Sequence, residues 1–315
     1  MTTSKATVAI LSIGQMGLGV ASLLLAHDFR VITNVSDRST ATQERARSAG
    51  IEQLPSDEEL VAQADYILSI VPPKDAPATA QRIVEAVKSG ARKEKREDLW
   101  FLDLNAGSPD GVTKLYHIFK REAPSVAFVD GGIIGAPPSL KEDASWFRPG
   151  IPLSGPRRLS DAPRAGARLA DVLNARFLGP EIGTASGLKA CFAALSKGFT
   201  ALALQSYVTA TQLHVLPDLK HYLDIYNPTA REKAERSIVG CTTKAYRWIE
   251  EMHQIGDTFA VQGGFGDQAR VFREIAGVYQ GLADLVEQQG TSGLDCDEGV
   301  ASKFGARMKQ RRGSM

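Results

Sequence analysis

The sequence is poor in cysteine and has no excess of charge of either sign. Its three cysteines, Cys191, Cys241 and Cys296, are widely spaced and odd in number, which excludes a disulfide framework and matches no metal-ligand spacing. We therefore expect no metal, and we expect Cys191 and Cys241 to be buried free thiols because both fall in apolar helical patterns. The 37 basic and 36 acidic side chains leave a net charge of +1, which gives no support for binding nucleic acid or a membrane surface.

Long apolar runs and a leader segment are also missing. No run of 18 apolar residues occurs, and the polar residues Met1–Ala6 lead directly into an apolar run rather than a signal peptide. We expect a cytoplasmic chain that spans no membrane. One basic run without acids lies at the C-terminus, where we expect a solvated, frayed end; it comprises Lys303, Arg307, Lys309, Arg311 and Arg312.

The 315 residues suffice for two domains. Residues 1–182 alternate short apolar runs with helical patterns such as Thr40–Ala49 and Pro77–Lys88. The runs are Val8–Leu11, Val31–Thr33, Tyr66–Val71, Trp100–Leu104, Val126–Val129, Ile151–Leu153 and Arg176–Leu178. This alternation predicts an α/β Rossmann domain, with a doubly wound, mostly parallel sheet.

Residues 183–315 carry helical patterns and no strand signal. We predict long helices over Thr184–Leu213, Thr229–Phe259 and Asp267–Gln289, and a shorter helix over Pro217–Tyr226. The first helix carries an apolar stripe at spacings of four and three: Leu188, Phe192, Leu195, Phe199 and Leu202. Because one small helical domain cannot cover so long a stripe, we predict at least a homodimer through the helical domain.

A glycine-rich turn follows the first apolar run. The sequence Ser12-Ile13-Gly14-Gln15-Met16-Gly17 has the form G-x-G-x-x-G with serine first, and it lies between a predicted strand and a predicted helix. In this context Gly14 lets the backbone approach a pyrophosphate, Gly17 lets the helix pack on the strand, and the helix N-terminus offers amides to phosphates. The turn predicts a dinucleotide site.

The turn after the second apolar run bears on the choice of cofactor. An acid here, as Asp37, typically holds the adenosine ribose diol, whereas Arg38 and Ser39 suit the additional phosphate of NADP. We predict that NADP(H) is preferred over NAD(H).

Five motifs, in order, resemble the 6-phosphogluconate and β-hydroxyacid dehydrogenase superfamily over nearly the whole chain. They are the glycine-rich turn, Ser69–Pro73, Asp103–Pro109, Asp130–Gly135 and Gly183–Lys189. The resemblance implies that Val71, Pro72 and Asn105 flank the nicotinamide. It also implies that the loop residues Gly131, Gly132, Ile133 and Ile134 face the substrate and that Lys189 is catalytic.

The chemistry of Lys189 supports that role independently. Hydride transfer to a carbonyl carbon needs a proton at the oxygen, and a partly desolvated lysine near a helix N-terminus can supply it near neutral pH. Ala193 and Ser196 share its helix face, and Ala193 leaves room beside the lysine.

The chain departs from the typical hydroxyacid dehydrogenase at three places. Phe192 and Ala193 stand where asparagine or a His-Asn pair is usual, and Ile134 replaces a serine that holds the substrate carboxylate. The run from Asp130 to Pro138 is similar to imine reductases. Three functions therefore stay open: a carbonyl or hydroxyacid oxidoreductase that uses Lys189, an imine reductase, and an NADPH-binding protein without catalysis. The superfamily branch that the helical region resembles is poorly characterised.

Overall fold

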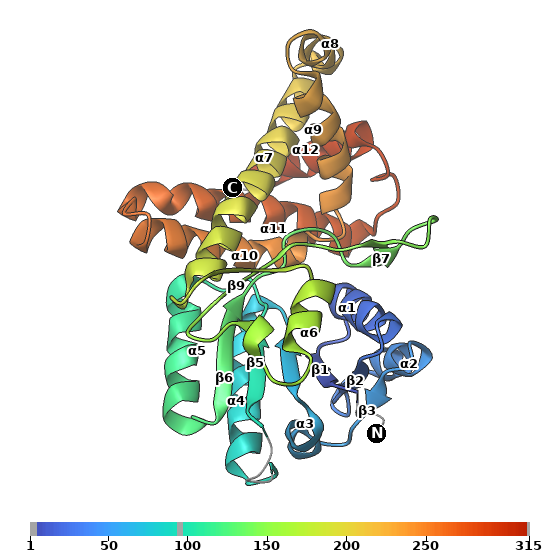
Figure 1. Cartoon of the computed structure of the whole chain (residues 1–315). Helices are drawn as coiled ribbons and strands as arrows, with labels where there is room; N and C mark the ends of the chain where they lie inside the picture. Colours follow the sequence, from blue (N-terminus) through green and yellow to red (C-terminus); the bar gives the residue numbers. More distant parts are fainter. Residues whose placement is uncertain (1–4, 93–96, 314–315) are drawn as a thin grey trace. The chain divides into compact units, whose positions relative to one another are not determined.

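The computed structural model describes residues 5–92 and 97–313, with side chains up to Gln310. The chain divides into two compact units, Met1–Lys189 and Ala190–Met315 (Figure 1). The sequence places the boundary between residues 182 and 183, whereas the division lies inside the long helix α7 (Thr184–Gln212).

The first unit is built on an eight-stranded sheet in the order β10-β9-β6-β5-β4-β1-β2-β3. Neighbouring strands are parallel except for β6 and β9, which are antiparallel. The fold-class prediction of a mostly parallel sheet is confirmed. The strands are β1 (Thr7–Leu11), β2 (Arg30–Thr33), β3 (Glu52–Gln53), β4 (Tyr66–Ser69), β5 (Leu99–Asp103), β6 (Val126–Gly131), β9 (Ile151–Ser154) and β10 (Ala175–Gly179).

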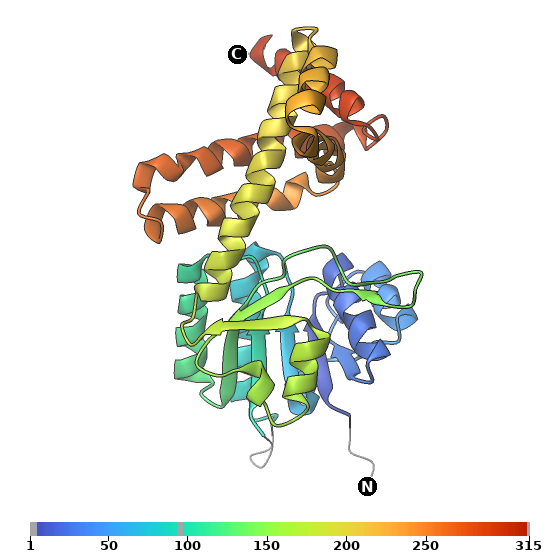
Figure 2. The ribbon, with the colours of Figure 1, turned by 45° about the horizontal axis from the view of Figure 1, so that its top comes forward.

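Helices cover both faces of this sheet (Figure 2). They are α1 (Gln15–Ala26), α2 (Thr40–Ser48), α3 (Asp57–Gln63), α4 (Ala76–Lys88), α5 (Pro109–Glu122), α6 (Gly166–Val172) and the 3-10 turns η1 (Pro73–Asp75) and η2 (Leu159–Asp161). Alternate residues of a strand point to opposite faces of the sheet. On β5, Trp100 and Leu102 pack in one apolar core, and Leu99 and Phe101 pack in the other. The interiors of β1, β4 and β5 are apolar because both faces are buried, and their polar residues lie at the strand ends.

Three strands have no counterpart in the sequence prediction. They are β3 and the hairpin of β7 (Ser139–Leu140) and β8 (Trp146–Phe147). Each is two residues long and none is fully buried, so none produces an apolar run.

The second unit is helical, as predicted. Besides α7 it contains α8 (Leu216–Tyr226), α9 (Pro228–Cys241), α10 (Ala245–Val261), η3 (Gly266–Arg270), α11 (Val271–Gln289) and α12 (Asp297–Gly313). The single helix expected over Thr229–Phe259 is wrong, because α9 ends at Cys241 and a turn precedes α10. That turn contains neither glycine nor proline. It lets buried Ile238 and Met252 on successive helices enter the same core.

The expectation of a frayed C-terminus is also wrong for the part that the structure describes. Helix α12 buries Val300, Ala301 and Phe304 in the core of the second unit. Arg307 pairs with Asp284 on α11 at 3.3 Å. The basic residues of this run therefore lie on a packed helix, and the side chains of Arg311 and Arg312 fall outside the described residues.

Helix α7 leaves much of its apolar stripe uncovered within one chain. The side chains of Leu188, Phe192, Leu195 and Leu202 are 44%, 48%, 77% and 58% exposed. Cys191, predicted to be buried, is exposed beside them, whereas Cys241 is buried. By length and composition α7 could cross a membrane, and 39% of its most apolar stretch is buried within the chain.

Candidate active site

The glycine-rich turn joins β1 to α1 in the conformation that its sequence predicts. A Cβ atom on Gly17 would lie 2.0 Å from the carbonyl oxygen of Ser12, so only glycine fits there. Ser12 has a positive φ of 82°, a region that favours glycine. No side chain among the described residues caps the N-terminus of α1 at Gly14. Its first amides are therefore available to an anionic ligand.

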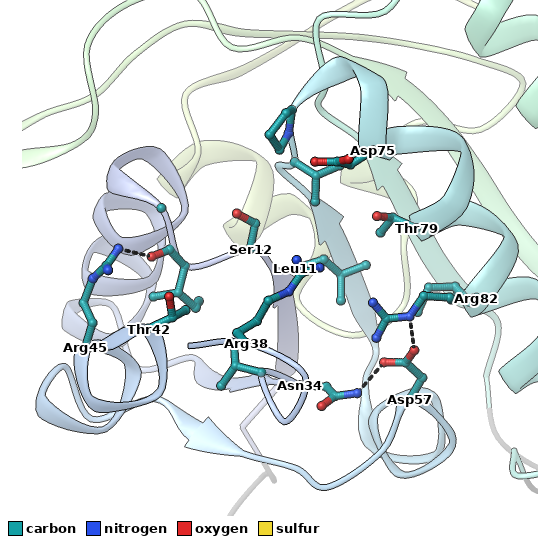
Figure 3. Close-up of a pocket in the computed structure, with 16 residues that line it drawn as sticks. Leu11, Ser12, Asn34, Arg38, Thr42, Arg45, Asp57, Asp75, Thr79 and Arg82 are labelled. Carbon is teal, nitrogen blue, oxygen red and sulfur yellow. Dashed lines mark hydrogen bonds and ion pairs between the residues drawn. The ribbon is translucent and has the colours of Figure 1, made fainter. Parts of the chain in front are cut away.

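Beside this turn lies a cavity of about 270 Å³ (Figure 3). Six residues predicted to bind a cofactor line it: Ser12, Ile13, Gly14, Arg38, Val71 and Pro72. Gln15, Met16, Gly17, Ser39 and Asn105, also predicted as cofactor ligands, are not among its lining residues.

Several lining residues were missed by the sequence reasoning. They are Asn34, Thr42, Arg45, Asp57, Asp75, Thr79 and Arg82, with apolar Leu11, Val35 and Ile83. Thr42 and Arg45 lie three residues apart on α2, a helical spacing that puts them on one face and could have identified them together. Asp57 and Arg82 come from α3 and α4, and no local pattern connects them to the turn.

Two arginines are anchored at the wall of this cavity. The Nη1 of Arg45 donates to the carbonyl oxygen of Ile13 at 2.9 Å. The Nε of Arg82 donates to Asp57 at 2.8 Å, and Asp57 also accepts from Asn34 (Figure 3). The cavity thus presents guanidinium groups to a ligand close to the glycine-rich turn, an arrangement suited to phosphates.

Ser39 has a local structural role. It is the N-cap of α2, where its hydroxyl accepts from the amide of Thr42 and lies 3.1 Å from the Thr42 hydroxyl. An N-cap serine stabilises its helix, so Ser39 supports the element that carries Thr42 and Arg45.

Asn105, in the loop after β5, joins this loop to the loop after β4. Its Oδ1 accepts from the amide of Val71 at 2.7 Å, and its Nδ2 donates to Ser69 at 3.0 Å and to Asp103. Asn105 is buried, and its side-chain amide is directed at the protein. It therefore fixes Val71 at the edge of the cavity.

The carboxyl group of Asp103 is buried beneath this loop. Burial raises its pKa to about 6, against the opposing effect of the hydrogen bonds from Asn105. The negative charge of Asp130 on the neighbouring strand raises it further.

Asp130 anchors the first turn of α7 to the end of β6. Its carboxylate accepts from the amides of Gly183, Ala185 and Ser186 at 2.9, 3.1 and 3.2 Å. It also accepts from the hydroxyls of Ser154 and Ser186 at 2.8 and 2.6 Å. A single buried carboxylate thereby satisfies amides that a helix N-terminus leaves without intrahelical partners.

Lys189 lies one turn further along α7. Its Nζ donates to the carbonyl oxygen of Ile133, and a Cβ atom on Gly132 would lie 3.0 Å from the lysine Cβ. Burial lowers the pKa of Lys189 to about 8. The sequence alone predicts an additional contribution from the helix N-terminus. Because the Asp130 carboxylate caps those amides, burial is the cause that the structure supports.

The other predicted substrate residues fall in two places. Gly131 ends β6, where a Cβ atom would lie 2.6 Å from Leu104, and Ile134 bonds through its backbone to Gly150. Ala193 and Ser196 belong to the second unit, where Ala193 is in the core and Ser196 donates to the Ala193 carbonyl. Among the described residues, no group of three or more His, Cys, Asp or Glu side chains could hold a metal.

Comparisons with known proteins match a part of each unit to a family model. Residues 7–92 match the family described as NADP oxidoreductase, coenzyme F420-dependent, and residues 210–282 match a domain of unknown function, DUF1932. An uncharacterised 28.5 kDa protein of Methanothermus fervidus is 26% identical over 251 residues, which cover 77% of this chain and 88% of the relative.

Solved structures share the architecture over almost the whole chain. The 3-hydroxyisobutyrate dehydrogenase of Mycobacterium tuberculosis, solved with L-serine, has a TM-score of 0.60 and 16% identity, with 98% of this chain and 100% of that chain covered. The imine reductase of Myxococcus stipitatus, solved with NADP+, has a TM-score of 0.53 and 15% identity, with 95% and 99% covered. The predicted resemblance is confirmed: the two family matches, and the fold that the chain shares with a 3-hydroxyisobutyrate dehydrogenase and an imine reductase, agree with it.

Proposed function

We propose that the protein is an NADPH-dependent oxidoreductase that interconverts a carbonyl and a hydroxy group on a small molecule, with Lys189 as the general acid or base. The observation that carries this proposal is the placement of Lys189. Its partly buried amine has a pKa of about 8 and is held by Ile133, in the unit that also contains the nucleotide-sized cavity.

The first unit suits a dinucleotide. The strictly required Gly17, the uncapped N-terminus of α1 and the arginine-bearing cavity fit a pyrophosphate and an adenosine ribose. The matched NADP oxidoreductase family and the NADP+-bound imine reductase support a nicotinamide cofactor. We infer that NADP(H) is preferred because Arg38 lines the cavity at the end of β2, where an additional ribose phosphate lies in this fold class.

The bound cofactor would supply or accept a hydride at the substrate carbon. Lys189 would release a proton from Nζ to the carbonyl oxygen in reduction, so that C=O, hydride and proton together give the alcohol. The Ile133 carbonyl orients the amine, Gly132 leaves space for the lysine stem, and Asp130 fixes the first turn of the helix that carries it. In oxidation the neutral amine takes the proton back.

Imine reduction is the second candidate. Ile134 offers its backbone to Gly150 and presents no side-chain hydroxyl for a substrate carboxylate, which favours a less polar substrate. An iminium ion already carries its proton, so Lys189 would contribute less to that reaction.

Oxidation of NADPH with panels of 2-keto acids, 3-oxo acids, ketones and cyclic imines tests these functions. Turnover of a carbonyl compound that depends on Lys189 supports the proposal. Tight NADPH binding with no turnover of any panel would instead indicate a binding protein.

We further propose a cytoplasmic homodimer whose subunits meet through the helical unit and which binds no nucleic acid.

A further inference from the structure

Five charged side chains gather at the cavity: Arg38, Arg45, Asp57 and Arg82 line it, and Asp37 lies beside Arg38 and Arg82. Asp37 lies 3.2 Å from Arg38 and 3.4 Å from Arg82, and Asp57 lies 2.8 Å from Arg82. These two aspartates and two arginines therefore balance one another. Asp75, the other acid of the lining, lies at the opposite rim of the cavity (Figure 3).

Arg45 is the cation of this group that no carboxylate balances within the described residues. Its hydrogen bond goes to the neutral carbonyl of Ile13 through Nη1. A guanidinium has five N–H donors, so this bond orients Arg45 toward the glycine-rich turn and leaves donors for an anion. Thr42, one turn earlier on α2, adds a hydroxyl to the same wall.

We propose that Arg45 is the main determinant of preference for a phosphorylated ribose, and that Asp37 is a counter-ion that competes with the phosphate for Arg38. The inference rests on the proposed nucleotide site and deepens it. Arg38 can offer its full charge to a phosphate only when it leaves Asp37, whereas Arg45 has no such competitor. Asp37 is therefore not the acid that holds a ribose diol in this protein.

The two roles open to Asp37 give opposite expectations. If it holds the ribose hydroxyls, Asp37→Asn weakens the binding of a nucleotide that lacks the 2′-phosphate, such as 5′-AMP. If it is a counter-ion, Asp37→Asn leaves the binding of 5′-AMP unchanged and strengthens the binding of 2′,5′-ADP, because a competing charge has been removed. An exposed ion pair is weak, so the expected gain is about two- to five-fold.

The experiment is calorimetric titration of the full chain with 2′,5′-ADP and with 5′-AMP. We expect Arg45→Ala to raise the Kd for 2′,5′-ADP about 10- to 100-fold, which corresponds to the loss of a hydrogen bond to a charged group. The same substitution should change the Kd for 5′-AMP less than two-fold. Arg45→Gln should behave alike, since it removes the charge but keeps a donor. Arg47→Ala is the matched control, because Arg47 lies on the same helix, pairs with Glu44 and does not line the cavity.

The outcomes separate this inference from the proposed function. If the Arg45 variants lose affinity equally for both ligands and Arg47→Ala binds both as the unaltered protein does, the inference is overturned, while the proposed nucleotide site is still supported. Weaker 5′-AMP binding in Asp37→Asn would overturn the inference as well. Failure of the unaltered protein to bind either ligand or NADPH would instead overturn the proposed function.

Discussion

The side-chain amine of Lys189 donates a hydrogen bond to the backbone carbonyl of Ile133, so a residue of α7 is fixed to the loop after β6. A second contact runs parallel to it three residues earlier on each segment, where Ser186 donates to Asp130 at 2.6 Å. Both contacts lie within the first unit. The loop after β6 thus positions the lysine through a backbone carbonyl, while the side chain of Ile133 is buried in the core.

Replacement of Lys189 by methionine should remove most of the carbonyl reductase activity. A general acid contributes about a hundred- to ten-thousand-fold, so the loss should appear in kcat, with the Kd for NADPH nearly unchanged. Lys114→Met on the exposed face of α5 is the control. Retention of carbonyl activity would contradict the lysine mechanism. A loss of about ten-fold or less on an imine substrate would favour imine reduction.

The pH dependence should follow the amine of Lys189. Burial lowers its pKa to about 8, and reduction needs the protonated form. We therefore expect kcat/KM for reduction to be level below about pH 8 and to fall above it, and oxidation to show the opposite trend. Initial rates measured in both directions between pH 6 and pH 10 check this. A reduction rate that rises through pH 8 would contradict the assignment.

Gly132→Ala should impair catalysis more than folding. The added Cβ would lie 3.0 Å from the Cβ and 3.3 Å from the Cγ of Lys189, so the lysine stem must shift. Such a shift displaces the amine, and we expect kcat to fall about ten-fold or more while NADPH binding is kept.

The adjacent glycine provides the comparison. In Gly131→Ala the added Cβ would lie 2.6 Å from Leu104 and 2.7 Å from Leu153 in the core, so stability should fall first. Thermal unfolding and kinetics of both variants distinguish the two effects. Equal losses of melting temperature with no difference in kcat would refute the role of Gly132.

Asp103→Asn should stabilise the first unit at neutral pH. Burial raises the pKa of Asp103 to about 6, so the folded chain keeps a proton that the unfolded chain releases near pH 4. The contribution of this carboxyl to stability is therefore largest below about pH 4 and falls as the pH rises to about 6. The asparagine variant avoids that loss, and we expect a gain of about 1–3 kcal/mol at pH 7 and little gain at pH 4.

Hydrogen exchange of the β4 and β5 amides measures this gain in the first unit alone. Asp143→Asn is the contrast, because hydrogen bonds from Ser145 lower the pKa of that exposed carboxyl on the loop between β7 and β8. It should leave those amides unchanged. A gain from Asp103→Asn that is the same at pH 4 and pH 7 would refute the linkage.

The sequence predicted the elements whose burial gives a strong period. The seven apolar runs are all strands, and α7 was placed to within one residue of its end because its pattern continues over many turns. The turn between α9 and α10 was missed because residues 242–244 contain no glycine or proline, and packing in the core sets it. The bracing role of Asn105 and the convergence of Arg45, Asp57 and Arg82 depend on contacts between distant segments, which one sequence does not reveal.

The last prediction concerns assembly through α7. Leu195 is 77% exposed and Leu202 is 58% exposed, seven residues apart on the same face of α7. An apolar helix face of this kind is normally covered by another surface. In a two-fold symmetric dimer the same stripe from each copy would cover the other.

We expect sedimentation to show a dimer at micromolar concentration and the Leu195→Lys, Leu202→Lys double variant to be monomeric, with unchanged helix content by circular dichroism. The control is Leu140→Lys on β7, a leucine that is 61% exposed and lies away from α7 in the sequence; it should leave the dimer intact. Charged side chains on an apolar interface must be desolvated without partners, a cost large enough to separate the copies. A protein that sediments as a monomer before any substitution, or a double variant that remains dimeric, would show that the stripe has another role.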